Sequence, residues 1–591
     1  MNGELPIGFI DGSVDATTQR FRVVLNDDAI VQLDELLVGR QELPRAQGLL
    51  THFGIVVEAT NSIEGASLAS DTQRIFDTMT MPGQRVRTVT VQALRTNPEL
   101  WLPPLPGTPV FVAHGPDRHL ALFQDRMVGR ELYIGLDHSL APVALDWTFL
   151  NGENGAHISI SGISGVATKT SYALFILYML MESDQGRALL GTHVSHTQAV
   201  IFNVKGEDLM HIDRPNAKFV NDKQAHEMWD ALGVRNPGPF QAVELYAPPA
   251  RADGDIPAAN VVSRASSDYT VFAWTPLDFV SRGLIQFVFS DARETSQIPF
   301  IVDHVRAALV RHAMLSRITP GAVIIKVQPV RGRGRDFERA AQQLVGATAG
   351  LVDDGDVEIR TFADLVDFLI GAIENDTQGH WIPRTVTNTN EAFLRRLIGM
   401  SRRLGQLVRC DAEPLDLRGN INVIDIHSLH DDAQRFVVGA VLDQIWQAKQ
   451  GSGRFPLSFV VLDELNKYAP RHGSSPIKEM LVDIAARGRS LGVILIGCQQ
   501  NSSGVEGAIT DNAAIKVVGR LDSSHADEYR FLPVELRQRA TRFLPGTMVV
   551  DQPAVPAPIP IVFPFPPFAT NVSEDVQGPA TTDGDAPLEL I

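Results

Sequence analysis

The sequence predicts an α/β protein in which a parallel sheet covered by helices follows a small β-rich domain. Residues 1–145 hold short β-branched runs separated by Gly, Pro and Asn. From about residue 150, apolar strand-like runs alternate with helix-like stretches, which is the pattern of a buried parallel sheet. Longer helix-like stretches interrupt this alternation over 217–384 before it resumes. We therefore expect one sheet domain whose two parts are separated by an insertion.

The N-terminal region, residues 1–145, is expected to form a small β-barrel or a sandwich. Its strand-like runs are FRVVL (21–25), FGIVVEA (53–59), VRTVTVQAL (86–94), PVFVAH (109–114) and LALF (120–123). Turn residues separate these runs, and the sequence leaves the choice between the two architectures open.

The first part of the sheet domain is predicted at 146–216. HISIS (157–161) and AVIFNV (199–204) are strands, and KTSYALFILYMLMES (169–183) is a helix that is apolar nearly all round. Its apolar run is far shorter than the roughly 20 residues that cross a bilayer. We therefore expect this helix to be buried in the protein core.

The rest of the chain is predicted in four segments. An inserted, largely helical subdomain occupies 217–384, the second part of the sheet domain occupies 385–551, a Pro-rich extension at 552–570 docks on the core or a neighbour, and 571–591 is a disordered tail. The later strands are expected in INVIDIHSL (421–429), LSFVVLDEL (457–465), GVILIGCQQ (492–500), AIKVVGRL (514–521) and GTMVVD (546–551).

Composition and charge limit the possible functions. A chain with 44% apolar and 20% charged residues is typical of a globular protein. Its net charge of −17 argues against a wholly basic surface, although a local basic channel needs only a few Lys and Arg. The two cysteines, Cys410 and Cys498, lack metal-ligand spacing, and the first residues lack a secretion signal. We expect a cytoplasmic protein without zinc, disulfides or a membrane span.

The stretch SGISGVATKTS at 161–171 joins a predicted strand to a predicted helix. A phosphate-binding loop, G-x-x-x-x-G-K-[ST], has this position because backbone N–H groups and the helix N-terminus hold phosphates while Lys reaches the terminal ones. Here Gly162 lies seven residues before Lys169 rather than six, and Thr168 stands where Gly normally allows positive φ. The alternative is a plain strand-to-helix turn.

The run FVVLDEL at 459–465 is four apolar residues followed by Asp463 and Glu464. This is the layout of a Walker B strand, in which the Asp holds Mg²⁺ through water and the Glu polarises the water that attacks the γ-phosphate. The alternative is a buried strand that ends in surface acids.

Two further predicted strands end in polar residues. GVILIGCQQ ends in Gln499 and Gln500, where NTPases place a γ-phosphate sensor, and VVGRLDS places Arg520 where a cation can stabilise transferred charge. Solvated glutamines and a surface ion pair are the respective alternatives. Together, the four features in this order favour a nucleotide site over four unrelated turns.

The order of these motifs resembles that of the HerA family of hexameric DNA-translocating ATPases, relatives of FtsK. The resemblance is carried by GISGVATKT, VVLDEL, ARGRSLGVILIGCQQ, NAAIKVVGRLDS, the Pro-rich extension and the opening IGFIDGS, which is similar to the N-terminal barrel of that family. It covers most of the chain except the tail and parts of 217–384.

The resemblance implies a RecA-like P-loop ATPase core with an N-terminal small β-barrel, an inserted largely helical subdomain and a Pro-rich C-terminal extension. It implies ATP and Mg²⁺ as cofactors and, as partners, double-stranded DNA, a NurA-like nuclease and further copies in a homo-hexamer. The residues it assigns are Gly162, Gly165, Thr168, Lys169, Thr170 and Ser171 to nucleotide binding, Thr170 and Asp463 to Mg²⁺, and Glu464, Gln499 and Arg520 to catalysis.

This sequence departs from the family pattern in two places. The glycines of the phosphate loop are displaced, and Ala156 precedes His157 where HerA-like chains often carry an arginine finger. An arginine finger contributes factors of about 10³ to 10⁵ to turnover. The displaced glycines call the nucleotide affinity into question, and Ala156 calls cooperative hydrolysis into question.

DNA contacts are predicted in the loop NKYAPRHGSSP (466–476), where Lys467, Arg471 and His472 could face a ring pore. A solvated loop is the alternative. RGRGR (331–335) is the densest basic run, and it also suits an ordinary strand-to-helix connection. In KGED (205–208), Lys205 or Glu207 could line the nucleotide site, because ligands of open α/β sheets bind at the carboxyl ends of the strands.

Three functions follow from these patterns. The first is a HerA-type motor that threads duplex DNA and acts with a nuclease in DNA end resection for recombinational repair. The second is a conjugation or secretion motor with the same core. The third is a weakly hydrolysing or inactive ring that scaffolds and regulates a nuclease, in repair or in defence against foreign DNA.

Overall fold

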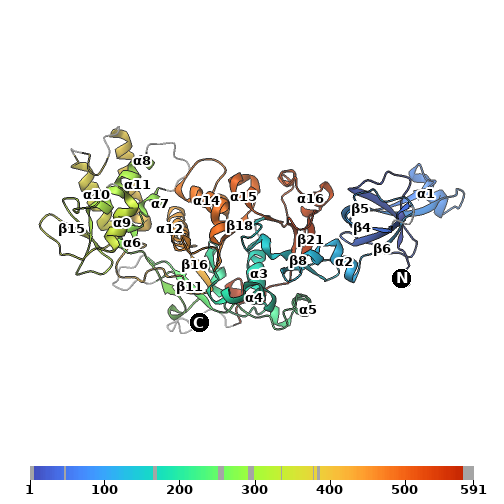
Figure 1. The fold of residues 1–591 in the computed structure, drawn as a ribbon, viewed down its shortest axis with the longest axis horizontal. Coiled ribbons are helices and arrows are strands. Elements are labelled where there is room, and N and C mark those ends of the chain that lie inside the picture. The colour runs from blue at the N-terminus through green and yellow to red at the C-terminus, as the bar shows by residue number, and fades with distance from the viewer. Residues whose placement is uncertain are drawn as a thin grey trace, which may run out of the picture.

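A computed structural model describes residues 5–44, 48–163, 169–250, 259–289, 298–334, 336–376, 379–382 and 387–576. The molecule is elongated, with a β-barrel at one end, a large sheet in the middle and a helical subdomain at the other end (Figure 1). The fold class predicted from the sequence is confirmed: a mixed α/β protein with a closed barrel, a large sheet and an inserted helical part.

The N-terminal domain is a closed barrel with the strand order β1-β2-β5-β4-β3-β6. Its strands are β1 (Gly8–Ile10), β2 (Arg20–Leu25), β3 (Leu36–Glu42), β4 (Leu49–Glu64), β5 (Gln84–Asn97) and β6 (Pro109–Val112). Two register shifts interrupt the long β4–β5 pair, at Phe53/Gly54 and at Val56/Glu58, and bulges of this kind bend strands as closure requires. At Gly54 a Cβ would lie 2.4 Å from the Val91 side chain, so glycine is needed there.

The barrel ends at Val112, before the boundary expected near residue 145. The prediction of a strand at 120–123 was wrong, because α2 (Gly115–Ala121) begins with Pro in its first turn and occupies this region. The next strands, β7 (Glu131–Leu136) and β8 (Pro142–Asp146), join the large sheet instead of the barrel. β7 is held there by pairing with the C-terminal strand β21 (Ile559–Val562).

The large sheet has the order β12-β11-β16-β10-β17-β18-β9-β19-β20-β21-β7-β8. From β12 to β19 all neighbours are parallel, and from β19 to β8 they are antiparallel. Its further strands are β9 (Ile158–Ser161), β10 (Gln198–Asn203), β11 (Val243–Ala247), β12 (Thr270–Val271), β16 (Ile421–Asp425), β17 (Ser458–Leu462), β18 (Val493–Gln499), β19 (Ile515–Val518) and β20 (Thr547–Asp551). The strands expected from 157 to 551 are therefore present.

Both faces of the parallel part are buried. Along β17, Phe459 and Val461 belong to the core beneath α3 (Lys169–Met181), whereas Val460 and Leu462 belong to the core beneath α12 (Asp431–Lys449) and α14 (Pro476–Leu491). This alternation follows from the two-residue period of a strand. It explains why these strands are continuous apolar runs in the sequence.

The inserted subdomain contains α6 to α11 and a small antiparallel sheet. Its elements are α6 (Pro276–Ser281), α7 (Ile285–Val288), α8 (Ile298–His312), β13 (Ala313–Leu315), β14 (Val323–Ile325), α9 (Phe337–Val345), β15 (Val357–Ile359), α10 (Phe362–Glu374) and α11 (Thr387–Leu404). β11 and β12 lie within the segment predicted as the insertion, 217–384, yet belong to the large sheet. Among the described residues no helix has an apolar stretch long enough to cross a membrane.

The Pro-rich segment packs on the core of the same chain. β21 pairs with β20, and Phe563 contacts Tyr172 and Phe175 of α3. Further along, Phe568 is 1% exposed and its ring lies 4.7 Å from that of Phe240. The segment is therefore a structural part of the α3 core.

We predict that Phe568→Ala lowers the free energy of unfolding by about 3–5 kcal/mol, because it removes a buried ring and leaves a cavity. Phe565→Ala is the matched control: this ring is 36% exposed, and the expected loss is about 1 kcal/mol or less. Urea unfolding of the two variants measures the difference. Equal losses would show that Phe568 does not anchor the segment.

Candidate functional site

The candidate site lies where the carboxyl ends of the central parallel strands meet. Ser161 at the end of β9 pairs with Gln499 at the end of β18, and Leu462 at the end of β17 pairs with Gly497. Side chains that follow these strands therefore collect at one edge, which is where open α/β sheets bind ligands.

Thr170 and Asp463 come together at this edge. The Thr170 hydroxyl donates a hydrogen bond of 3.1 Å to Asp463 Oδ2, although 293 residues separate them. Thr170 is in the first turn of α3, and Asp463 follows β17 directly and is almost fully buried. A hydroxyl and a carboxylate at this spacing are oxygen donors of the kind that Mg²⁺ prefers.

Lys169 begins α3, and its side chain is buried. Its Nζ donates to the Gly162 carbonyl at 2.9 Å. Burial lowers the pKa of Lys169, although the nearby Asp463 carboxylate opposes this effect. The ammonium therefore lies at a helix N-terminus beside the loop that follows β9. Gly165 and Thr168 fall outside the described residues, and Ser171 lines the cleft described below.

Both oxygens of Asp463 have donors. Oδ1 accepts the N–H of Glu464 at 2.8 Å, and Oδ2 accepts Lys205 Nζ at 3.2 Å as well as the Thr170 hydroxyl. Lys205 Nζ also lies 3.4 Å from Glu464 Oε1. Burial lowers the pKa of Lys205, but the charges of Asp463 and Glu464 outweigh it and the net pKa is raised.

Glu464 has a left-handed backbone, with φ of 55°. A non-glycine residue adopts this conformation at a cost, and residues held in it cluster at functional sites. Here it ends β17, starts the short helix α13 (Leu465–Tyr468) and leaves the carboxylate partly exposed. The two acids therefore point to different surroundings, one buried and one accessible.

Gln499 is fully buried at the end of β18. Its Nε2 donates to Ser159 Oγ at 2.7 Å and to Ser161 Oγ at 2.9 Å. Within the described part of the chain, its Oε1 has no hydrogen-bond partner. Sequence reasoning missed both serines, although their alternation in HISIS places them on one face of a strand.

Arg520 is exposed after β19. Its carbonyl accepts the N–H of Ile163 at 2.8 Å, and a Cβ at Gly162 would lie 3.2 Å from the same oxygen. The Arg520 backbone thus supports the loop that follows β9, and its guanidinium is open to solvent.

The three residues predicted to contact DNA have different surroundings in the structure. Lys467 pairs with Asp431 at 2.6 Å and donates to Gln434, so its charge is already balanced. Arg471 and His472 are exposed on the following loop. The Arg471 N–H donates to the Gly504 carbonyl, which ties this loop to the segment after β18.

In KGED at 205–208, Lys205 and Glu207 have different roles. Lys205 faces the acid pair, whereas the Glu207 carboxylate accepts the N–H groups of Val262 and Ser263 at 2.9 and 2.8 Å. Glu207 therefore holds the chain in place instead of lining the site.

A cleft of about 250 Å³ opens beside Asp463. It is lined by Thr170, Ser171, Leu174, Phe202, Asn203, Val204, Lys205, Asp208, Leu209, Asp463 and Thr570. Thr570 comes from the C-terminal segment and was not predicted, because its position depends on how that segment packs. In the described residues, no group of three His, Cys, Asp or Glu side chains could hold a metal, so a cation here would rely on Asp463 and Thr170.

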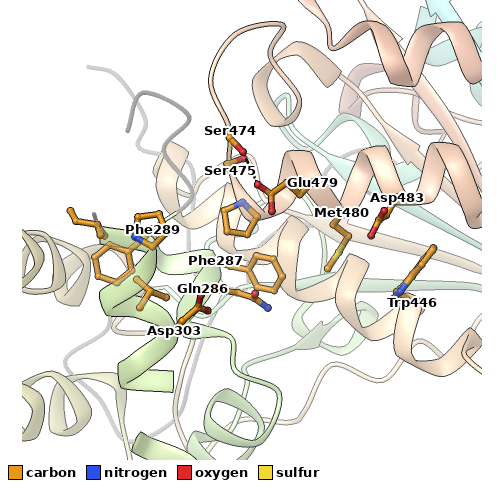
Figure 2. A pocket seen from close by; sticks show the side chains of 14 residues that line it. Gln286, Phe287, Phe289, Asp303, Trp446, Ser474, Ser475, Glu479, Met480 and Asp483 are labelled. Carbon is orange, nitrogen blue, oxygen red and sulfur yellow. Dashed lines mark hydrogen bonds between the residues drawn. The ribbon is translucent and has the colours of Figure 1, made fainter. Parts of the chain in front are cut away.

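A larger cavity, of about 350 Å³, lies at the junction of α7, α8, α12 and α14. Figure 2 shows Phe287 and Phe289 on one side of it and Glu479, Met480 and Asp483 of α14 on the other. None of the residues that line it belongs to the candidate site, so we place the chemistry at the smaller cleft.

Comparison with known proteins gives fold likenesses alone. No protein-family model and no curated protein matches the chain. VirB4 of Thermoanaerobacter pseudethanolicus is 14% identical, the match covers 74% of this chain and 98% of that chain, and the TM-score is 0.43. The unbound bacterial conjugative coupling protein TrwBΔN70 is 11% identical, the match covers 74% of this chain and 90% of that chain, and the TM-score is 0.43. TrwB in complex with ADP and Mg²⁺ is 10% identical, with 73% of this chain and 90% of that chain covered and a TM-score of 0.40. Likenesses this distant carry no argument about activity.

His157 yields a prediction about pH. It directly precedes β9, and burial lowers its pKa to about 4. The folded state keeps His157 neutral, whereas the unfolded state binds a proton below pH 6.5, so stability falls as the pH falls from 6.5 towards 4.

We expect His157 to account for about 3 kcal/mol of lost stability between pH 7 and pH 4. His157→Asn, which tolerates the positive φ of 67° at this position, should remove that part of the pH dependence. Urea unfolding at several pH values measures both proteins. Parallel stability curves would show that His157 is not the group responsible.

Proposed function

We propose that the chain is a Mg²⁺-dependent ATPase that moves double-stranded DNA. The observation that carries the proposal is the Thr170 hydroxyl 3.1 Å from the Asp463 carboxylate, with Glu464 next in the chain. These residues meet at the carboxyl edge of a parallel sheet, beside a lysine at a helix N-terminus. That combination serves phosphoryl transfer, which depends on placed charges and an oriented nucleophile.

The residues present fit Mg²⁺ and ATP. Thr170 and Asp463 would hold the ion, and Lys169, Ser171 and the α3 N-terminus would bind the phosphates. When bound, Mg²⁺ neutralises the charge that develops on the phosphates.

The chain's own groups have separable tasks. Lys169 would exchange the Gly162 carbonyl for a phosphate oxygen, and the partly exposed Glu464 would orient the attacking water and accept its proton. Gln499 is held by Ser159 and Ser161, so its amide has a fixed position from which to sense the terminal phosphate.

The finer proposal is a HerA-type motor, a homo-hexameric ring that threads duplex DNA and acts with a NurA-like nuclease in DNA end resection for recombinational repair. It is supported by the sequence resemblance, and the exposed Arg520 is available to a neighbouring subunit. Arg471 and His472 would contact DNA phosphates, which carry charge but no sequence information.

A second function is favoured by two observations. The Glu464 and Asp463 carboxylates share a lysine, and Ala156 is buried where an arginine finger is often found. A weakly hydrolysing ring that scaffolds a nuclease and regulates it by nucleotide binding would fit both.

Steady-state ATP hydrolysis with and without linear duplex DNA tests the proposal. We expect DNA to stimulate turnover and Lys169→Ala to reduce it by about 10²–10³-fold. Arg126→Ala is the control, because Arg126 pairs with Glu99 beside the N-terminal barrel and should leave turnover unchanged. Turnover that is indifferent to Lys169 would contradict the proposed site.

Glu464→Gln separates motor from scaffold. In a motor it should reduce hydrolysis by about 10²–10⁴-fold while ATP binding persists, because the variant keeps the size of the side chain but loses its base. Nucleotide affinity and DNA-end processing with the partner nuclease are measured together. Full nuclease stimulation by the inactive variant would favour the scaffold.

A further inference from the structure

Lys205 bridges the two acids of the candidate site. Its Nζ lies 3.2 Å from Asp463 Oδ2 and 3.4 Å from Glu464 Oε1. The Asp463 oxygen that it contacts is also the one that accepts the Thr170 hydroxyl. A carboxylate oxygen has two lone-pair directions, so Lys205 and Thr170 together occupy the oxygen that the proposed metal site offers.

The backbone around Lys205 is fixed, whereas its side chain can move. Asn203 Nδ2 donates to the Gly206 carbonyl at 2.7 Å and to Asp425 at 2.8 Å, and Gly206 has the positive φ of 51° that this turn requires. Glu207 holds the next residues through Val262 and Ser263. The Lys205 side chain itself is 48% exposed, so its ammonium can leave the acids without a change in the fold.

The charges explain why a cation belongs at this position. Asp463 is 5% exposed and Glu464 is its neighbour, so two carboxylates would repel each other without a shared counter-ion. Lys169 is also near Asp463 but donates to Gly162, and Lys205 is the ammonium that forms ion pairs with both acids among the described residues.

We propose that Lys205 is a tethered counter-ion that keeps divalent metal off Asp463 until nucleotide arrives. The inference rests on the proposed function of this site. Metal alone has to displace the ammonium, whereas metal that arrives with nucleotide brings phosphates to which the released ammonium can bind. Lys205 is therefore a positioning residue that links metal entry to nucleotide binding.

Mn²⁺ binding to the full-length protein, followed by electron paramagnetic resonance without nucleotide, tests the inference. We expect Lys205→Met to bind Mn²⁺ at least 10-fold more tightly than the unaltered protein, because the competing ammonium is gone. Lys205→Arg keeps the charge and should resemble the unaltered protein. Arg126→Met is the matched control, since Arg126 also pairs with an acid, Glu99, but lies beside the N-terminal barrel, away from the acid pair, and should change nothing.

A second measurement does not depend on metal affinity. In EDTA, Lys205→Met should melt at a lower temperature than the unaltered protein, because two carboxylates have lost their counter-ion. Added Mn²⁺ should raise its Tm by more than it raises that of the unaltered protein. A folded Lys205→Met protein whose Mn²⁺ affinity equals that of the unaltered protein overturns the inference.

Asp463→Asn distinguishes this failure from failure of the proposed function. Asp463→Asn could weaken Mn²⁺ binding in the presence of ATP while Lys205→Met leaves Mn²⁺ binding unchanged in the absence of ATP. In that case the metal site is supported and the counter-ion role of Lys205 is wrong. If Asp463→Asn has no effect in either condition, the metal site itself is wrong and the inference falls with it.

Discussion

The register of the three parallel strands β9, β18 and β17 is the constraint on which the site depends. Gln499 stands beside Ser161, and Leu462 stands beside Gly497, because β9, β18 and β17 are hydrogen-bonded in these positions. A shift of one residue would turn each side chain to the other face of the sheet. The buried strands exclude such a shift, since both of their faces already belong to apolar cores. The hydrogen bond between Thr170 and Asp463 is therefore a product of sheet packing.

The same packing gives each polar group a different environment. Asp463 is buried and fully partnered, Glu464 leaves the strand through a left-handed backbone and is accessible, and Gln499 is held by two serines. In the proposed ATPase, adjacent residues would therefore carry out separate parts of one reaction. The accessible acid suits proton transfer, and the buried one suits a fixed ligand.

Much of the sheet domain could be predicted from the sequence, because fully buried strands and the all-round apolar helix α3 leave strong patterns. Prediction failed where tertiary contacts determine the type of element or the sheet to which a strand belongs. LALF became the end of α2 and a turn, β7 and β8 left the barrel for the sheet, and VELYA became a sheet strand within a presumed insertion. In the site, the strand ends could be predicted, whereas the Lys205 contact and the Thr170–Asp463 bond required the register.

Thr570 gives the cleft an unusual dependence on the order of synthesis. It lines the same cleft as Thr170, and it is held there because its N–H and hydroxyl donate to Glu574, whose carboxylate also accepts from Asn216. The barrel, by contrast, closes with residues 8–112 alone. As the chain emerges from the ribosome, the barrel can fold early, since domains generally fold as units and N-terminal ones first. The cleft is completed only after about 460 further residues, from 113 to Thr570, have been added, so the nascent chain passes most of its synthesis without a finished pocket.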